Sequence, residues 1–479
     1  MRPFTNPAQR RARIALVTGA AAIAVSACAS IPRLGTAPAP KTSAAYAASQ
    51  SFAAPAAEWP SDCWWTAYGD PQLNDLIDEA LAGAPDLAIA RARVSEADAL
   101  AEAVRSTLGP QLNGVATVGE MKMSYNNGLP PGVVEHGWHA GSLDGLSLNL
   151  QIDFFGKNRA LLAAATSSAE AARAEAAAAR LALSTSVAAV YAELDQLYAD
   201  RDAAEDALRV RVESQDLIER RRAQGLETQT ALERAHAGRA ATEAELAAID
   251  EAIGLTKNRI AALLGDGPDR GRAIDRPKPG AIRAFGLPSD LKAELIGRRP
   301  DVVAARLTAE AAAHRIKAAH ADFYPNVNLA GFIGAESLGL NYLTQSGSTL
   351  GQVGPAVTLP IFSSGRLQGA YREARAAYDG AVAVYDQTLT HALNDVADSA
   401  VSARALDVRL AKSREAFAAS TRAYDLARAR YAHGLGTYLE VLNAQDALIA
   451  ARRTVADLET RAFTLDVALV RALGGGFHA

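Results

Sequence analysis

Four short segments of the chain alternate apolar and polar residues. We expect strands at about 111–119, 143–155, 326–334 and 353–362. In the clearest of them one face carries Leu146, Leu148, Leu150, Ile152 and Phe154, and the other carries Ser147, Asn149, Gln151 and Asp153. A period of two predicts a β-strand with one apolar and one polar face. A length of roughly nine to eleven residues is typical of a strand that crosses a membrane.

The strands occur as two pairs, each joined by a polar loop. The loops, at 120–141 and 335–352, are rich in Gly, Asn, Ser and Pro. Four strands cannot close a barrel, and an open sheet edge is not tolerated in lipid because its backbone groups find no water there. We therefore expect the chain to share a barrel with copies of itself; strand counting alone permits eight, twelve or sixteen strands. A soluble sheet with its polar face covered is the alternative.

A long helix is expected after each strand pair. The stretches from about 157 to 222 and from about 365 to 432 contain hardly a helix breaker, and each would be roughly 100 Å long. Glycine supplies the left-handed backbone that ends a helix. We expect Gly225 and Gly434 to end these helices at hairpin tips, about 223–228 and 432–437. Each return helix is shorter, and the helix before each strand pair makes up the difference if the two stack end to end.

One block of sequence is present twice. The stretch beginning at Pro85 returns without a gap at Pro300. Gly225 and Gly265 also recur, with the same offset for both, as Gly434 and Gly474. The shared positions of the block are Pro85, Asp86, Ala90, Arg91, Pro110, Asn113 and Gly119, repeated as Pro300, Asp301, Ala305, Arg306, Pro325, Asn328 and Gly334. Duplication of a unit indicates a pseudo-symmetric architecture. We expect a first repeat at 58–268, a linker at 269–288 and a second repeat at 289–479.

The first residues have the pattern of an export signal. Arginines precede an apolar run that is too short to span a bilayer and that ends in small residues before Cys28. This ending resembles the lipobox of bacterial lipoproteins, which predicts a signal peptide at 1–27, acylation of Cys28 (palmitate among the chains) and a flexible tether at 28–57. An ordinary export signal with an incidental cysteine is the alternative. Ala29, by the same resemblance, favours sorting to the outer membrane.

Composition excludes several functions. Alanine carries much of the 49% hydrophobic content and aromatic residues only 6%, which suits long packed helices better than a thick core. A net charge of −4 gives no footprint for nucleic acid. The eight His residues are scattered, so we expect no metal site and no cofactor, and Cys63 is expected to be a small packed residue. Because no nucleophile or phosphate motif has a fitting context, we expect no enzyme.

Several motifs together resemble the TolC/NodT family of outer-membrane efflux channels, in its lipoprotein branch. They span nearly the whole chain after the signal peptide. The motifs are Ala27-Cys28, the WWTAYGDPQLNDLIDEAL opening, Asp153-Phe154-Phe155-Gly156-Lys157, Arg298-Arg299-Pro300-Asp301, Pro360-Ile361-Phe362 with Gly365-Arg366, Tyr431-Ala432-His433-Gly434, and Ala472-Leu473-Gly474-Gly475-Gly476.

This resemblance implies an α+β membrane channel. Three chains would form a twelve-stranded β-barrel in the outer membrane and a twelve-column α-barrel in the periplasm. The homotrimer would be the passive exit duct of a tripartite multidrug efflux pump, joined through a periplasmic adaptor to an inner-membrane transporter of the RND (resistance-nodulation-division) type. The tips at Gly225, Leu226, Gly434 and Leu435 would meet the adaptor.

The resemblance also implies a gate at the second tip. In this family a leucine and, four residues later, an aspartate narrow the pore; the matching residues are Leu439 and Asn443, and Tyr431 matches a tyrosine that latches neighbouring coils. Because Asn443 replaces the aspartate, Glu440 would bring the charge of this constriction. The alternative is that Glu440 and Asn443 face solvent on the exterior.

A periplasmic lipoprotein adaptor and a structural coiled coil are the rival functions, but neither carries two hairpins with a strand pair before each.

Overall fold

The computed structural model describes residues 31–124, 126, 136–278, 280 and 285–478. The expected signal peptide and Cys28 lie outside the described residues. The chain forms two compact units, one made of 1–40, 94–171 and 305–384, and the other of 41–93, 172–304 and 385–479. We call them the strand unit and the hairpin unit.

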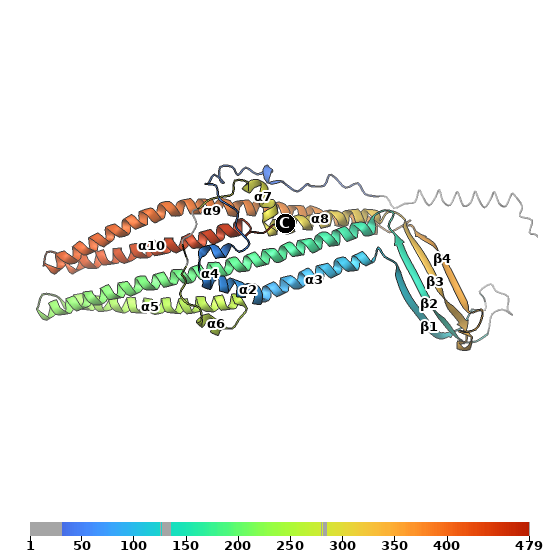
Figure 1. The fold of residues 1–479 in the computed structure, drawn as a ribbon, viewed down its shortest axis with the longest axis horizontal. Helices are drawn as coiled ribbons and strands as arrows, with labels where there is room; N and C mark the ends of the chain where they lie inside the picture. Colours follow the sequence, from blue (N-terminus) through green and yellow to red (C-terminus); the bar gives the residue numbers. More distant parts are fainter. Residues whose placement is uncertain (1–30, 125, 127–135, 279, 281–284, 479) are drawn as a thin grey trace, which may run out of the picture. The chain divides into compact units, whose positions relative to one another are not determined.

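The strand unit contains one antiparallel sheet with the order β1-β2-β3-β4 (Figure 1). This confirms the expected four strands. Their bounds are Gln111–Met121 for β1, His139–Ile152 for β2, Asn326–Leu338 for β3 and Thr349–Thr358 for β4.

The register places apolar side chains of neighbouring strands in rows on one face. Ile152 pairs with Val327, which pairs with Val357, and one step further Gln151 pairs with Asn328 on the other face. Several residues of the apolar face are strongly exposed, among them Ile333 at 63%, Val353 at 76% and Val357 at 64%. The sheet therefore presents an uncovered apolar surface and a separate polar surface, as the alternation predicts.

Two strands end earlier than expected. Strand β2 stops at Ile152 rather than near residue 155, because the Asp153 carboxylate accepts the backbone N–H groups of Asn158 at 3.2 Å and Arg159 at 2.9 Å. Asp153 thus caps the next helix instead of continuing the alternation, and Phe154 lies in the turn. Strand β4 stops at Thr358 rather than near residue 362; Pro360 has no N–H to give to a ladder.

Two helices of 67 residues follow the strand pairs: α4 at Lys157–Ala223 and α9 at Arg366–Ala432. At 1.5 Å per residue each is about 100 Å long. The other helices are α2 Pro71–Gly83, α3 Pro85–Ser106, α5 Gln229–Leu264, α6 Pro268–Arg272, α7 Leu291–Arg298, α8 Pro300–Ala321 and α10 Tyr438–Ala472. Within the described ranges, none of the helices combines the length and hydrophobicity needed to cross a membrane.

In the hairpin unit the return helices stack end to end on the helices that lead to the strands. Gly265 ends α5 with a φ of 80°, and a Cβ there would lie 2.7 Å from the ring of Pro85, the first residue of α3. Gly474, after α10, has a φ of 91°, and a Cβ there would overlap the carbonyl oxygen of Arg298, the last residue of α7, two residues before the start of α8. The expected end-to-end stacking is confirmed in both repeats.

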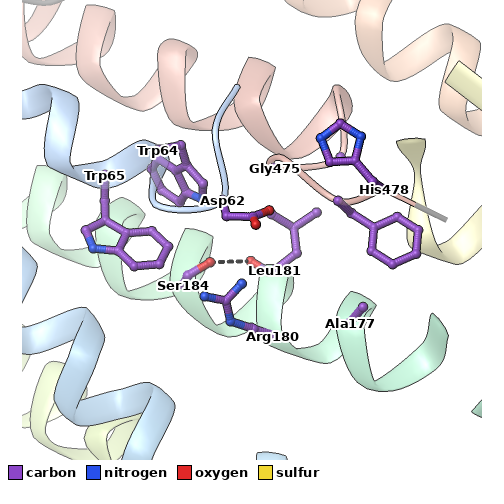
Figure 2. A pocket seen from close by; sticks show the side chains of 11 residues that line it. Asp62, Trp64, Trp65, Ala177, Arg180, Leu181, Ser184, Gly475 and His478 are labelled. Atoms are coloured by element: carbon purple, nitrogen blue, oxygen red, sulfur yellow. Dashed lines mark hydrogen bonds between the residues drawn. The ribbon is translucent and has the colours of Figure 1, made fainter. Parts of the chain in front are cut away.

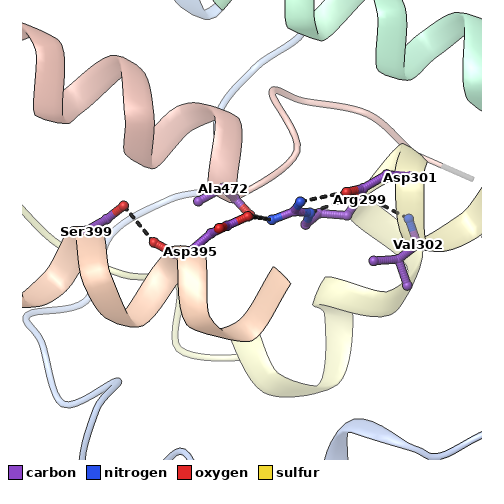
Figure 3. Close-up of polar contacts among 6 residues, drawn as sticks. All are labelled: Arg299, Asp301, Val302, Asp395, Ser399 and Ala472. Atoms are coloured by element: carbon purple, nitrogen blue, oxygen red, sulfur yellow. Dashed lines mark hydrogen bonds and ion pairs between the residues drawn. The ribbon is translucent and has the colours of Figure 1, made fainter. Parts of the chain in front are cut away.

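The second of these junctions also carries a buried charge network (Figure 3). Arg299, only 8% exposed, pairs with Asp301 at 2.6 Å and with Asp395 of α9 at 2.7 Å. Its guanidinium also donates to the carbonyl of Ala472 at the end of α10. The first repeat has Ala84 at the matching position, so it has no counterpart of Arg299.

A second buried network fixes the start of α2 in the hairpin unit. The Asp70 carboxylate accepts the N–H of Gln72 at 3.0 Å, the hydroxyl of Tyr191 at 2.6 Å and the N–H of Lys278 at 2.9 Å. Burial, reinforced by the nearby Asp70, raises the pKa of Tyr191 above its ordinary value. Tyr191 belongs to the main hydrophobic core together with Trp64 and Phe463. The core thus joins the N-terminal segment to α4 and α10. Cys63, which we expected to be packed, is instead exposed, because it precedes the short helix whose Trp64 enters the core.

The segment that we expected to be a flexible tether is hydrogen-bonded to α9 along its described part. In the strand unit, Arg375 donates to the carbonyls of Gly35 at 2.8 Å and Thr36 at 2.6 Å. In the hairpin unit, Arg404 donates to the carbonyl of Ala53 at 2.9 Å. Lack of hydrophobic periodicity predicted flexibility, but these bonds use the backbone of the segment, which leaves no pattern in its sequence.

Candidate functional site

The two hairpin tips have the same backbone. Gly225 and Gly434 both have a φ of 74°. The next residue in each tip, Leu226 or Leu435, donates its N–H to a carbonyl of the last helical turn, at 2.9 and 2.8 Å respectively. The return helix then begins after a capping threonine, Thr228 in the first tip and Thr437 in the second. This arrangement is the usual way to end one helix and start the next.

Each tip exposes one large apolar side chain. Leu226 is 60% exposed and Leu435 is 71% exposed. A Cβ placed on Gly225 or Gly434 would meet no atom within 4 Å. Each hairpin therefore ends in an open apolar point.

Tyr431 links the two tips. Its hydroxyl donates to the Oε1 atom of Glu227 at 2.7 Å, and its ring lies 4.5 Å from the guanidinium of Arg221. The side chain is only 2% exposed. Burial, together with the hydrogen bond to Glu227, raises the pKa of Tyr431 above 10.0, so the hydroxyl stays protonated and able to donate at neutral pH. The second tip is thus latched to the first.

Further contacts hold the two hairpins together near the tips. Tyr431 packs in a small apolar cluster with Tyr424, Val441 and Tyr438. Ion pairs join α4 to the second hairpin. They are Arg211 with Asp446 at 2.6 Å and Arg428 with Glu213 at 3.2 Å.

The structure separates the four residues that we expected at the constriction. Leu439, Glu440 and Asn443 lie within about 100° of one another on the exposed face of α10, and Leu439 is 53% exposed. Tyr431 lies between the coils instead. The exposed face thus combines one apolar, one acidic and one amide side chain within one helical turn.

The sequence did not identify the partners of Tyr431 or the buried Gln445. Glu227 and Arg221 contact Tyr431 from more than 200 positions away, and such a long-range pairing leaves no local pattern. Gln445 is fully buried, and neither polar atom of its amide has a hydrogen-bond partner in the described part of the chain. Gln445 lies one helical turn after Val441, and this spacing alone predicts that both residues lie on the same, packed face of the helix.

A cavity of about 220 Å³ lies elsewhere in the hairpin unit (Figure 2). Its lining includes Trp65, Arg180 and Gly475, and the Arg180 guanidinium lies 5.8 Å from the Trp65 ring. The hydroxyl of Ser184 is used within its own helix, donating to the Leu181 carbonyl at 3.1 Å.

Across the described ranges, His, Cys, Asp and Glu side chains form no group of three or more that could hold a metal ion.

Comparisons with known proteins agree with this architecture. The family model for outer membrane efflux proteins matches residues 76–266 and 291–475. Over 314 residues the chain is 36% identical to the fusaric acid resistance protein FusA of Burkholderia cepacia, covering 65% of this chain and 59%, less than two thirds, of that protein. It is 29% identical over 420 residues to the probable outer membrane lipoprotein SilC of Salmonella typhimurium, covering 86% and 88% of the two chains. The crystal structure of the outer membrane protein VceC from Vibrio cholerae has a TM-score of 0.84 and 43% identity, covering 88% and 100%.

Proposed function

Because the chain belongs to the outer membrane efflux protein family and is an outer membrane efflux channel, we propose that three copies of it form a passive exit duct of a tripartite pump, gated at the second tip. The chain is a channel and not an enzyme. Small solutes, including drugs, would pass from the periplasm to the outside through its lumen.

The single observation that carries the trimer is the sheet itself. In the described structure β1 pairs only with β2, and β4 only with β3, so both edges of the sheet lack a partner strand. The exposed apolar face suits lipid, but open edges do not occur there. Pairing β4 of one copy with β1 of the next satisfies both edges at once. Three copies give twelve strands, the number that the family resemblance implies.

The gate is proposed on the exposed face of α10. Threefold symmetry would bring three copies of Leu439, Glu440 and Asn443 to one level of the duct. Three glutamates around a narrow axis would repel anions and raise one another's pKa. The latch from Tyr431 to Glu227 supports this assignment, because it holds the second hairpin against the first and keeps the constriction in place.

The proposed partners are a periplasmic adaptor and an inner-membrane RND-type transporter. The exposed side chains of Leu226 and Leu435, beside Gly225 and Gly434, provide apolar points for the adaptor. Apolar surface of this kind at a hairpin end favours a partner over bulk solvent. An adaptor or structural coiled-coil function for this chain is disfavoured by its two strand pairs.

Lipid attachment is proposed at Cys28. Support comes from the small residues before it and from the similarity to SilC, whose name describes a lipoprotein. Several acyl chains together give lasting attachment to a membrane. Replacing the cysteine by Cys28→Ser is expected to abolish incorporation of labelled palmitate. Label retained by this variant would refute the anchor.

The oligomeric state tests the central part of the proposal. Native mass spectrometry of the detergent-extracted protein is expected to give a mass of three chains, and a planar bilayer containing it is expected to show channels of low conductance. A monomer without conductance at any protein concentration would refute the shared barrel. If the unaltered trimer conducts poorly and substitutions in the second tip increase its conductance, the gate is supported.

A further inference from the structure

We propose that the strand unit carries a binding site for a phospholipid headgroup, built by α4, α8 and α9 beside the strand ends. The site rests on the proposed function in one respect, namely that the apolar face of the sheet lies in the membrane. Its chemistry is recognition of a lipid phosphate by a lysine and by histidines, with aromatic side chains against the acyl chains.

The site is a cavity of about 610 Å³. Its polar lining is basic, because Arg159, His314, Lys317 and His320 contribute to it and no carboxylate does. The aromatic rings of Phe155 and Tyr371 complete it, with small and aliphatic side chains between them. A cavity of this composition favours an anion that also has an apolar part.

Lys317 is the centre of the proposed site. Its side chain is exposed, and it makes no ion pair or hydrogen bond with the described residues. Arg159, in contrast, is engaged by Asp153 at 3.3 Å. An ammonium group without a protein partner is available to a phosphate, and lysine binds phosphate as a point charge.

The histidine beside it is held in place by aromatic rings. The His320 ring lies 5.5 Å from the ring of Tyr324 and 5.7 Å from that of Tyr371. His314 contributes a second imidazole, 3.9 Å from Glu310, a distance too long for a hydrogen bond. The imidazole N–H groups can therefore donate to phosphate oxygens next to Lys317.

Exposed aromatic residues place the cavity at the boundary of the membrane. Phe155 stacks on Tyr324 with ring centres 4.8 Å apart and is 47% exposed. Phe154 is 65% exposed and Phe362 is 87% exposed. All of them follow or precede the strands within a few residues. Aromatic girdles mark the interface of membrane barrels, which is the level of lipid headgroups.

The direction of the α4 side chains indicates that the cavity opens toward lipid rather than toward the lumen. The amide of Asn158 donates to Gln151, which belongs to the polar face of the sheet, at 2.8 Å. A helix turns by about 100° per residue about its axis. The directions of Arg159, Ala160 and Ala163 therefore differ from that of Asn158 by roughly 150° on average. The cavity therefore lies on the side of α4 that faces away from the polar surface.

A lipid titration of the purified full-length channel tests the site. The probe is phosphatidylglycerol added in detergent, and the readout is the bound lipid seen by native mass spectrometry. The test variant combines Lys317→Gln with His320→Gln, and we expect its affinity to be about tenfold weaker than that of the wild type. The matched control is Arg315→Gln, which removes one charge from the same helix; its side chain contacts Ser168 and does not line the cavity.

The control is expected to change the affinity less than about twofold, since an exposed charge contributes little. Equal lipid affinity in the wild type and the double variant would overturn the site. Diacylglycerol of the same chain length should bind weakly, and equal binding of diacylglycerol would also overturn it. Displacement of the lipid by millimolar inorganic phosphate would show a solute site and overturn the lipid assignment. Bilayer conductance of the same preparation reports separately on the channel function.

Discussion

The first and second hairpin tips have matching backbones, but their side chains form different surfaces. Gly225 and Thr228 of the first tip recur as Gly434 and Thr437 of the second, with the same φ and the same cap. Both tips expose a leucine, Leu226 or Leu435, but the residues around it differ. Where the second tip has Leu439, Glu440, Asn443 and Tyr431, the first has Thr230, Ala231, Arg234 and Arg222. Duplication has thus kept the residues that shape the backbone of the tip and changed several of the side chains that are exposed on the return helix or packed against the neighbouring coil.

The junctions between stacked helices show a similar difference. In both repeats a glycine with positive φ allows close contact between helix ends, but only the second junction has the Arg299 network. The second repeat therefore carries both the latch and the charged junction. The comparison predicts that equivalent substitutions in the two repeats have unequal effects.

The largest effect is expected for Gly474→Ala. A Cβ at this position would overlap the carbonyl of Arg298, and the left-handed backbone adds strain, so we expect a loss of about 3 to 5 kcal/mol in the free energy of unfolding. Gly265→Ala should cost about 2 kcal/mol, since its nearest contact is the ring of Pro85. Thermal unfolding followed by circular dichroism measures both.

The control for this pair is Gly254→Ala within α5, where a Cβ would meet nothing within 4 Å. Alanine favours a helix there, so this variant should be as stable as the wild type or slightly more stable. Wild-type stability of Gly474→Ala would contradict the close packing of the second junction.

The next effect is expected for Arg299→Ala. This change removes a buried guanidinium from two carboxylates and a carbonyl, and we expect a loss of about 3 kcal/mol. Arg91→Ala in the first repeat removes an exposed arginine and should cost less than about 1 kcal/mol. Adding Asp395→Asn to Arg299→Ala should restore part of the loss. An unchanged unfolding temperature for Arg299→Ala would show that the network does not stabilise the junction.

The smallest effect on stability is expected for Tyr431→Phe. Losing the hydroxyl leaves Glu227 without this donor, so hydrogen exchange near the second tip should accelerate about tenfold, equivalent to about 1.4 kcal/mol. Tyr438→Phe is the control, because its ring lies in the same cluster and its hydroxyl makes no hydrogen bond with described residues. Equal exchange in the two variants would refute the latch.

The raised pKa of Tyr431 fixes the sign of its pH dependence. A tyrosine with a folded pKa above 10.0 binds its proton more tightly in the folded protein, so the free energy of unfolding falls as pH rises above about 10. Between about pH 6 and pH 9 the latch should be insensitive to pH. Protection of the second tip from exchange, corrected for the intrinsic rate, tests this.

Elements with a periodic pattern could be predicted from the sequence. The alternation around Leu150 gave the strands, and the repeated glycines gave the turns, because each depends on local backbone geometry. The end of β2 was misplaced because Asp153 serves as a cap, a role that alternation does not reveal. The partners of Tyr431 and Arg299 come from distant helices, and their pairing depends on packing that the sequence pattern does not record. Resemblance named Tyr431 as a latch but not Glu227 as the residue that it binds.

Single-channel conductance in planar bilayers tests the central claim most directly. The test variant replaces Leu439, Glu440 and Asn443 by alanine, and the matched variant of the first tip carries Thr230→Ala and Arg234→Ala, because Ala231 is already alanine. We expect low conductance in the wild type, an increase of about fivefold or more in the second-tip variant, and little change in the first-tip variant. High conductance of the wild type, or equal conductance of all three proteins, would contradict a gate formed by the second tip.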